Sequence, residues 1–163
     1  MTLQEMLASA PGAFPALGAP NRPWMHFGEL RKLSQTIGAQ LAGFGLGRGD
    51  RLAIVLPNGP EMASAFVTIA QWCVTAPLNP AYKRDEYAFY MDDLKAKALV
   101  VMADEDGPAV QAADELGIKI LRLHSSDASP AGVFSLRGSA LASATAAPEA
   151  VPAQADDIAL ILH

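Results

Sequence analysis

The residues best suited for chemistry in this sequence directly follow apolar runs that are typical of strands. Asn79 and Tyr82 come after the run 74–78, and His163 follows the run 159–162. In parallel α/β folds, the loops after the carboxyl ends of strands hold the ligands. Amide, phenol and imidazole groups there can donate or accept hydrogen bonds. We predict these three side chains as candidates for a cleft wall, although a rigid βα turn is the simpler explanation for residues 79–82.

Glycines at positions 45, 47 and 49 have the spacing of a dinucleotide-binding loop but the wrong context. A phosphate-binding glycine loop follows a strand and opens a helix, so that helix N–H groups face the anion. Here the glycines follow a helical pattern and precede a strand pattern. A Gly-x-x-x-x-Gly-Lys loop and a Gly-x-Ser-x-Gly elbow are both missing from the sequence. These observations disfavour an NAD-type oxidoreductase and an α/β-hydrolase.

Acidic and sulfur-containing residues give no better candidate for catalysis or metal binding. The acidic run 104–106 could hold a divalent cation, but acidic residues at strand exits are usually solvated. The three histidines are far apart in the sequence. Cys73, the only cysteine, lies in an apolar segment, which predicts a buried, unreactive thiol and excludes an intrachain disulfide. We therefore predict no metal site and no catalytic residue within residues 1–163.

The composition is that of a folded protein without a nucleic-acid or membrane surface. Half of the 163 residues are apolar, 18% are charged and the net charge is −5. Basic residues do not cluster, which argues against partners such as nucleic acid. Residues 62–82 carry no charge, but Gln71 and Pro77 interrupt them, which favours a buried helix and strand over a membrane span. Because the N-terminus does not resemble a signal peptide, we predict a cytoplasmic protein.

Helical and strand patterns alternate along most of the chain. A short amphipathic helix is predicted at the N-terminus, and an extended segment is predicted near 13–24. Further helices are predicted at 28–44, 61–72, 84–94 and 107–116. Strands are predicted at 52–56, 74–78, 98–102 and 118–123. Strands separated by single helices predict an α/β fold with βαβ crossovers and a mainly parallel sheet.

The amino-acid composition changes after residue 124. Residues 125–155 are rich in Ala, Ser and Pro and predict a surface excursion, with one short strand or helix near 133–141. The run 159–162 predicts a strand that needs cover on both faces. We therefore expect residues 1–163 to be the front part of a longer domain. On its own, this strand would be poorly protected and would favour self-association.

Three stretches resemble a known enzyme family. Gly47-Arg48-Gly49-Asp50-Arg51-Leu52-Ala53-Ile54, followed by Pro57-Asn58, resembles a motif near the start of adenylate-forming acyl-CoA synthetases. Ala76-Pro77-Leu78-Asn79-Pro80-Ala81-Tyr82, with Glu86, Tyr87 and Tyr90, resembles their next motif. Residues 156–163 are similar to the strand before their Thr-Ser-Gly-Thr-Thr phosphate loop. The residues in these stretches are most similar to those of oxalate–CoA ligase-like members, and then to those of 4-coumarate and fatty-acyl–CoA ligases.

This resemblance implies ATP-dependent activation of a small carboxylic acid to acyl-AMP and transfer of the acyl group to CoA, with Mg²⁺ offsetting the phosphate charge. The family's phosphate loop, magnesium-binding Glu and catalytic Lys come later than His163. The resemblance therefore implies a scaffold fragment that is inactive alone and binds none of ATP, Mg²⁺ or CoA by itself. A stand-alone α/β binding or regulatory module is the alternative.

Overall fold

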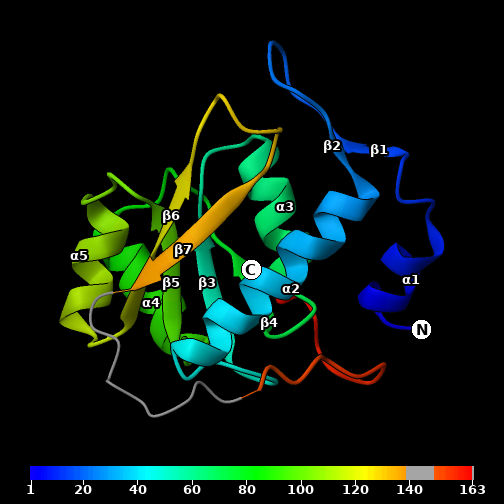
Figure 1. The fold of residues 1–163 in the computed structure, drawn as a ribbon. Helices are drawn as coiled ribbons and strands as arrows, with labels where there is room; N and C mark the ends of the chain where they lie inside the picture. Colours follow the sequence, from blue (N-terminus) through cyan, green and yellow to red (C-terminus); the bar gives the residue numbers. More distant parts are fainter. Residues whose placement is uncertain (139–148, 163) are drawn as a thin grey trace.

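Helices and strands alternate along the chain, as the sequence predicts (Figure 1). The computed structural model describes residues 1–138 and 149–162. The helices are α1 (Leu3–Ser9), α2 (Phe27–Gly43), α3 (Pro60–Ile69), α4 (Arg84–Asp93) and α5 (Pro108–Glu115). The strands are β1 (Pro15–Leu17), β2 (Met25–His26), β3 (Arg51–Val55), β4 (Val74–Pro77), β5 (Ala98–Met102), β6 (Lys119–Ser125) and β7 (Phe134–Gly138).

Five strands form one mixed sheet in the order β4-β3-β5-β6-β7. The β6–β7 pair is antiparallel and the other three pairs are parallel, which confirms the predicted α/β fold with a mainly parallel sheet. β4 contains Pro77 and lies at an edge of this sheet. Proline cannot donate a ladder hydrogen bond, and an edge position tolerates that loss.

Local sequence explains why these segments adopt these structures. Residues 52–55 of β3 are all buried, as expected for a strand that helices cover on both faces. Leu30, Leu33, Ile37 and Leu41 recur every three or four residues and form the buried stripe of α2. α3 and α5 each begin with proline, whose fixed φ suits the first helical turn. Proline also lacks an N–H, but N–H groups in the first turn have no partner within the helix, so no hydrogen bond is lost.

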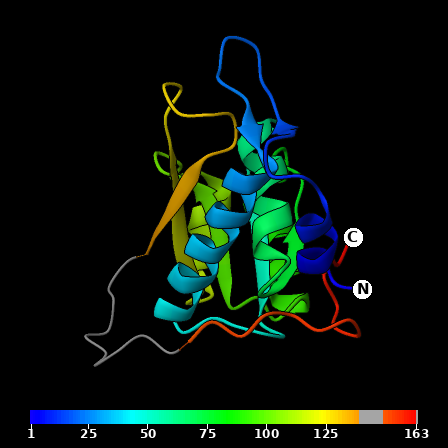
Figure 2. The same ribbon diagram turned by 45° about the vertical axis from the view of Figure 1, so that its right-hand side comes forward.

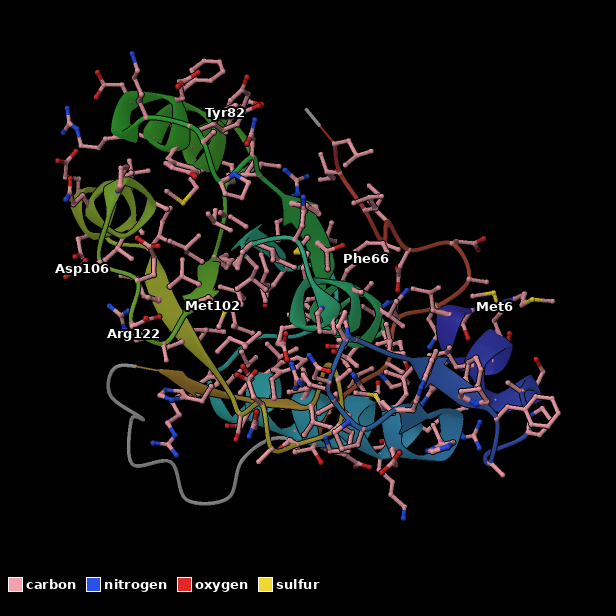
Figure 3. All side chains as sticks on the ribbon, turned by 90° about the horizontal axis from the view of Figure 1, so that it is seen from above. Met6, Phe66, Tyr82, Met102, Asp106 and Arg122 are labelled. Carbon is pink, nitrogen blue, oxygen red and sulfur yellow. The ribbon has the colours of Figure 1, made fainter. Side chains whose placement is uncertain are left out.

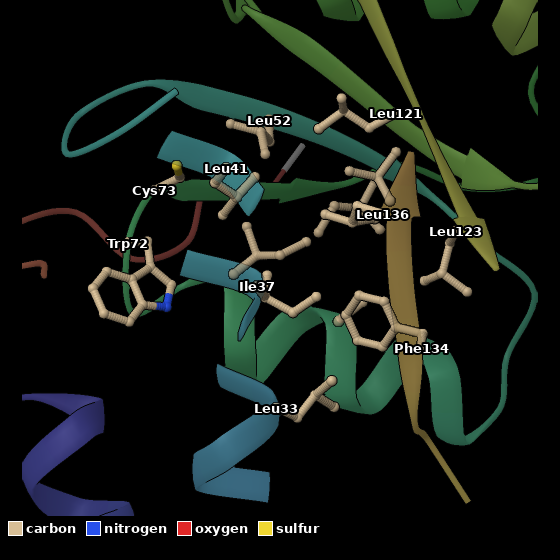
Figure 4. Packing of buried hydrophobic residues seen from close by; sticks show 14 of the residues in the cluster. Leu33, Ile37, Leu41, Leu52, Trp72, Cys73, Leu121, Leu123, Phe134 and Leu136 are labelled. Carbon is tan, nitrogen blue, oxygen red and sulfur yellow. The ribbon is translucent and has the colours of Figure 1, made fainter. Parts of the chain in front are cut away.

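Helices cover the sheet in two layers (Figures 1 and 2). α2 and α3 pack on one face, where the larger core includes Ile37, Leu52 and Leu121 (Figure 4). α4 and α5 pack on the other face, where a smaller core includes Met91 and Leu99. Alternate residues of the central strands enter the two cores, so the sheet is held from both sides.

The N-terminal segment is attached to the edge of this unit. Thr2 and Glu5 cap α1 reciprocally, with backbone-to-side-chain hydrogen bonds of 2.8 and 3.1 Å. The β1–β2 hairpin is held by Arg22, whose guanidinium forms a 2.6 Å ion pair with Glu61 at the start of α3. Arg22 also donates to the carbonyl oxygen of Pro130 at 3.1 Å. One mostly buried arginine thus joins three segments that are distant in sequence.

The segment 125–155 differs in part from the predicted surface excursion. β7 lies within it and pairs with β6, so the short element expected near 133–141 is a strand. Phe134 and Leu136 of β7 are buried in the larger core. An alternation of two large apolar residues is a weak signal in a segment rich in Ala and Ser, because burial depends on the partner strand. Residues 139–148 lie outside the described residues.

The run 159–162 does not form the buried strand that its apolar sequence predicts. It makes an isolated parallel bridge between Leu160 and Thr75 of β4. Leu160 is 37% exposed and Leu162 is 70% exposed. Cover is uneven: Ile161 packs against the smaller core, whereas Leu160 and Leu162, which alternate with it, are left exposed by the described residues. That this segment is poorly protected stays a prediction, which hydrogen exchange would test.

Candidate functional site

The carboxyl ends of three parallel strands meet at one edge of the sheet. β3 and β5 are neighbours there, but the chain leaves β3 toward α3 on one face and leaves β5 toward α5 on the other. Adjacent parallel strands whose connections go to opposite faces open a crevice at their carboxyl ends. This edge is therefore the candidate functional site, and Figure 3 looks onto the molecule from above, with Tyr82 and Met102 labelled.

A cavity of about 300 Å³ lies at this edge. Its volume is near the lower limit for small-molecule sites. Its walls come from the ends of β3 and β5, the loop after β4, and the first turn of α5. The lining residues are Val55, Leu56, Pro57, Pro80, Tyr87, Met102, Asp104, Glu105, Pro108 and Ala109. The cavity is thus largely apolar with two carboxylates at one side.

Asn79 stabilises the turn that follows β4. Its side-chain oxygen accepts a 3.0 Å hydrogen bond from the backbone N–H of Ala81. Its carbonyl oxygen accepts from the N–H of Tyr82 at 3.1 Å and from the hydroxyl of Tyr87 at 2.8 Å. These contacts support a rigid βα turn. Asn79 is exposed and does not line the cavity, and its role in a cleft wall stays a prediction.

Three tyrosines gather beside this turn. The ring of Tyr82 stacks on that of Tyr90, with centroids 5.1 Å apart and an interplanar angle of 22°. Tyr82 also meets the edge of Tyr87 at 5.8 Å. A hydrogen bond with Tyr90 raises the pKa of Tyr82, and partial burial adds to this effect. Burial, with the charges of Glu105 and Glu86, raises the pKa of Tyr87 to about 12. Both phenols are therefore protonated at neutral pH and can donate hydrogen bonds.

The acidic loop after β5 determines which ligands this edge could accept. Glu105 accepts a 2.7 Å hydrogen bond from the N–H of Gly107 and so closes the turn before α5. Arg122 donates to the carbonyl oxygens of Ala103, at 3.3 Å, and Glu105. Asp104 is exposed. Among residues 1–138 and 149–162, no three His, Cys, Asp or Glu side chains are placed to hold a metal ion.

These residues do not fit the phosphate groups of a nucleotide. Two carboxylates beside the cavity would repel phosphate groups. The glycines at 45, 47 and 49 follow α2 and precede β3, so they cannot present the N–H groups of a following helix to phosphate. The arrangement suits instead a small apolar group that carries a hydrogen-bond donor or a positive charge.

The other predicted residues are placed as follows. His163 lies outside the described residues. Cys73 is 2% exposed, as predicted, and burial followed by the charge of Asp50 raises the pKa of its thiol to about 12. In the described part of the chain, no helix combines the length and apolar character needed to cross a bilayer.

Sequence reasoning missed most of the cavity walls. Leu56, Pro57 and Tyr87 line the cavity but were not predicted as site residues. Leu56 and Pro57 carried a usable signal, since they lie at the carboxyl end of the apolar run 52–56. Tyr87 reads simply as a helix residue, and only the packing of α4 against the β4 exit brings it to the site.

Known proteins resemble this chain along most of its length. A sequence model described as AMP-binding enzyme matches residues 5–163. An acyl-CoA synthetase of Gibberella moniliformis is 30% identical over 124 residues, which are 74% of this chain and 22% of that protein. The oxalate–CoA ligase of Arabidopsis thaliana is 30% identical over 122 residues, which are 72% of this chain and 24% of the relative. The chain thus spans about a quarter of the length of these relatives.

A solved structure shows the same fold. Apo MatB from Rhodopseudomonas palustris superposes with a TM-score of 0.73 at 24% identity, covering 99% of this chain and 32% of that protein. At this identity the likeness shows the fold. The match over residues 5–163 shows the family that the sequence resemblance suggested: the chain belongs to the AMP-binding enzyme family, and one of its relatives is an acyl-CoA synthetase.

Proposed function

We propose that residues 1–163 form the N-terminal scaffold of an ATP-dependent acid–thiol ligase. In this proposal the whole enzyme activates a small carboxylic acid to acyl-AMP and then transfers the acyl group to CoA, in the cytosol. The single observation that carries the proposal is the family match over residues 5–163. The names of the relatives, an acyl-CoA synthetase and an oxalate–CoA ligase, support this reaction class.

Within such an enzyme the chain would position other residues rather than perform the chemistry. The hydrogen bonds from Tyr82 and Tyr87 to the carbonyl oxygen of Asn79 make the exit of β4 rigid. The 300 Å³ cavity offers apolar walls and two carboxylates, and none of the described residues that line it is basic. We propose that ATP, Mg²⁺ and CoA bind mainly through residues beyond position 163, and that this chain alone makes no acyl-adenylate.

Pyrophosphate release provides the direct test. The purified chain is incubated with ATP, MgCl₂ and CoA. One acid is added in each reaction: oxalate, 4-coumarate or a fatty acid. We expect release at the background level measured without protein. Turnover that increases with protein concentration and persists after repurification would show that the chain is catalytically complete and would contradict the scaffold role.

The product of the whole reading frame separates the two candidate functions. If that product forms AMP only when acid and CoA are both present, the ligase assignment stands. If it binds a ligand without consuming ATP, it is a binding or regulatory module that has kept this scaffold. Reading the coding sequence after codon 163 for a Thr/Ser/Gly-rich loop gives the same distinction in advance.

A further inference from the structure

One face of the β6–β7 pair carries an unusual group of basic side chains. Leu121 and Leu123 of β6 point into the larger core and are fully buried. Side chains alternate along a strand, so Arg122 and His124 lie on the opposite face. Arg137 of β7 joins them, because the sheet register pairs Arg122 directly with Arg137. The protein has a net charge of −5, whereas the side chains on this face are basic.

The direct opposition of two arginines needs a physical explanation. Like charges on directly opposite residues of an antiparallel pair destabilise the sheet. The guanidinium of Arg122 is held by two carbonyl oxygens and lies near the acidic loop after β5 (Figure 3). Arg137 is exposed, and its side chain has no hydrogen bond or ion pair within residues 1–138 and 149–162. The side chain of His124 is half-buried and has no such partner among these residues either. The sequence 139–148 that follows β7 contains no charged residue to balance Arg137.

A cavity lies over these side chains. Its volume is about 370 Å³, and its lining includes Val110 and Ile120 as apolar surface. The basic side chains Arg122, His124 and Arg137 supply the polar part of the lining, opposed by Asp114 of α5. The lining therefore carries net positive charge beside an apolar floor. Such a combination favours an anion that also has an apolar body.

We propose that Arg122, His124 and Arg137 form a binding site for a small organic oxyanion, a carboxylate or a phosphate ester, whose apolar body rests on Val110 and Ile120. The anion balances the charge of Arg137, whose side chain has no partner among the described residues. This site lies on the face of β6–β7 and is separate from the cavity at the ends of β3 and β5, with which it shares no lining residue. The inference does not depend on the proposed ligase function.

A purely structural explanation of Arg137 makes a different prediction. β7 is an edge strand, and charged residues on edge strands prevent pairing with other chains. In that case the charge would matter for solubility, but no small anion would bind at this face. Titration with small anions distinguishes the two explanations.

The experiment uses the purified ¹⁵N-labelled chain. Phenyl phosphate and benzoate are titrated separately, with inorganic phosphate as the probe that lacks an apolar body, while backbone amide shifts are recorded. We expect saturable shifts centred on residues 120–124 and 136–138, with a dissociation constant of about 1 mM or tighter for at least one organic anion. Inorganic phosphate should bind more weakly, because it makes no contact with the apolar floor.

Matched variants test which residues bind. Arg137→Gln should weaken binding about tenfold, and Arg137→Lys should recover part of the loss, because lysine keeps the charge without the guanidinium fork. Lys97→Gln removes the same charge outside the cavity and should leave binding unchanged. The proposal is overturned if neither organic anion saturates, if the shifts map elsewhere, or if Lys97→Gln weakens binding as much as Arg137→Gln. Preference for phenyl phosphate or for benzoate identifies the oxyanion.

Discussion

The hydroxyl of Tyr87 donates a 2.8 Å hydrogen bond to the backbone carbonyl oxygen of Asn79. This bond ties the buried side of α4 to the turn that follows β4. Tyr87 is 2% exposed and its ring also forms part of the cavity at the carboxyl edge. One side chain therefore fixes both the exit of an edge strand and a wall of the candidate site.

Removing this hydroxyl should destabilise the protein measurably. Tyr87→Phe keeps the ring but loses the bond to Asn79, and we expect the free energy of unfolding to fall by about 1 kcal/mol. Tyr87→Ala also leaves a cavity and should cost about 3 kcal/mol or more. Urea denaturation measures both values. Phe89→Ala removes a 65% exposed ring of the same helix that meets Tyr90 edge-on at 5.4 Å, and should cost clearly less stability than Tyr87→Ala. If Phe89→Ala lost as much stability as Tyr87→Ala, the special role of Tyr87 in holding the turn after β4 would be contradicted.

The contact between α2 and Trp72 predicts opposite effects for the same substitution at two glycines. A Cβ atom at Gly38 would lie 2.7 Å from Cδ2 of Trp72, and that ring cannot easily move because its N–H donates to the carbonyl oxygen of Ser34 at 3.0 Å. Gly38→Ala should therefore lower stability by about 1–3 kcal/mol, although alanine favours helices.

Gly43→Ala in the same helix is the matched control. A Cβ atom there meets nothing within 4 Å. Thermal and urea unfolding should show stability unchanged or raised by up to about 1 kcal/mol. If both variants lose stability equally, close packing of Trp72 against α2 is not the cause.

Burial of Cys73 predicts a loss of stability in alkaline solution. Its thiol has a pKa of about 12 in the folded protein, above the ordinary value of 9.0. Below pH 9 the thiol is protonated in both the folded and the unfolded state, so its contribution to stability is fully present. That contribution is lost as pH rises from 9 to about 12, where the unfolded thiol ionises first. The slope from this group approaches about 1.4 kcal/mol per pH unit.

Urea titrations between pH 8 and pH 11 measure this slope. Burial also raises the pKa of Tyr87 from 10.0 to about 12, so its phenol ionises first in the unfolded chain near pH 10 and adds to the decline. The comparison is therefore with Cys73→Ala, which should have a shallower decline. Parallel curves for the two proteins would exclude Cys73 as a contributor. Iodoacetamide should modify the native thiol at pH 8 far more slowly than the thiol in urea.

The exposed segment 158–162 should exchange its amide hydrogens quickly. It is attached through Thr75, whose N–H donates to Ala159 at 3.0 Å and whose carbonyl oxygen accepts from Ile161 at 2.9 Å. We expect these amides to exchange at least about 100-fold faster than those of β3, because local opening breaks few contacts. Hydrogen exchange with mass spectrometry tests this directly.

The same segment should promote self-association. Ile158, Leu160 and Leu162 are all exposed, next to the edge strand β4. Sedimentation velocity at rising concentration should show association that Leu162→Asp reduces, and Leu162 is exposed enough for the variant to fold. A monomer with slow exchange throughout 158–162 would contradict both expectations and would indicate an independently stable unit.

The sequence by itself determined the alternation of elements and the mainly parallel sheet. Apolar residues follow one another along strands such as β5, whereas they recur every three or four residues in helices such as α2. This difference in spacing can be read from neighbouring residues alone. Pro77 likewise favours an edge position by its own chemistry, because it has no N–H to donate to a neighbouring strand. The motifs around Asp50 and Asn79 pointed to the family without any knowledge of three-dimensional contacts.

The tertiary structure alone decided which residues meet. Tyr87 reaches Asn79, Gly38 contacts Trp72, and Arg122 opposes Arg137 only because strand order and register place them so. Register and packing are set by long-range burial, which a local pattern does not encode. For the same reason β7 became part of the sheet while the more apolar run 159–162 did not: β7 pairs with β6 along its length and buries Phe134 and Leu136 in the larger core, whereas the run 159–162 makes one isolated bridge to β4.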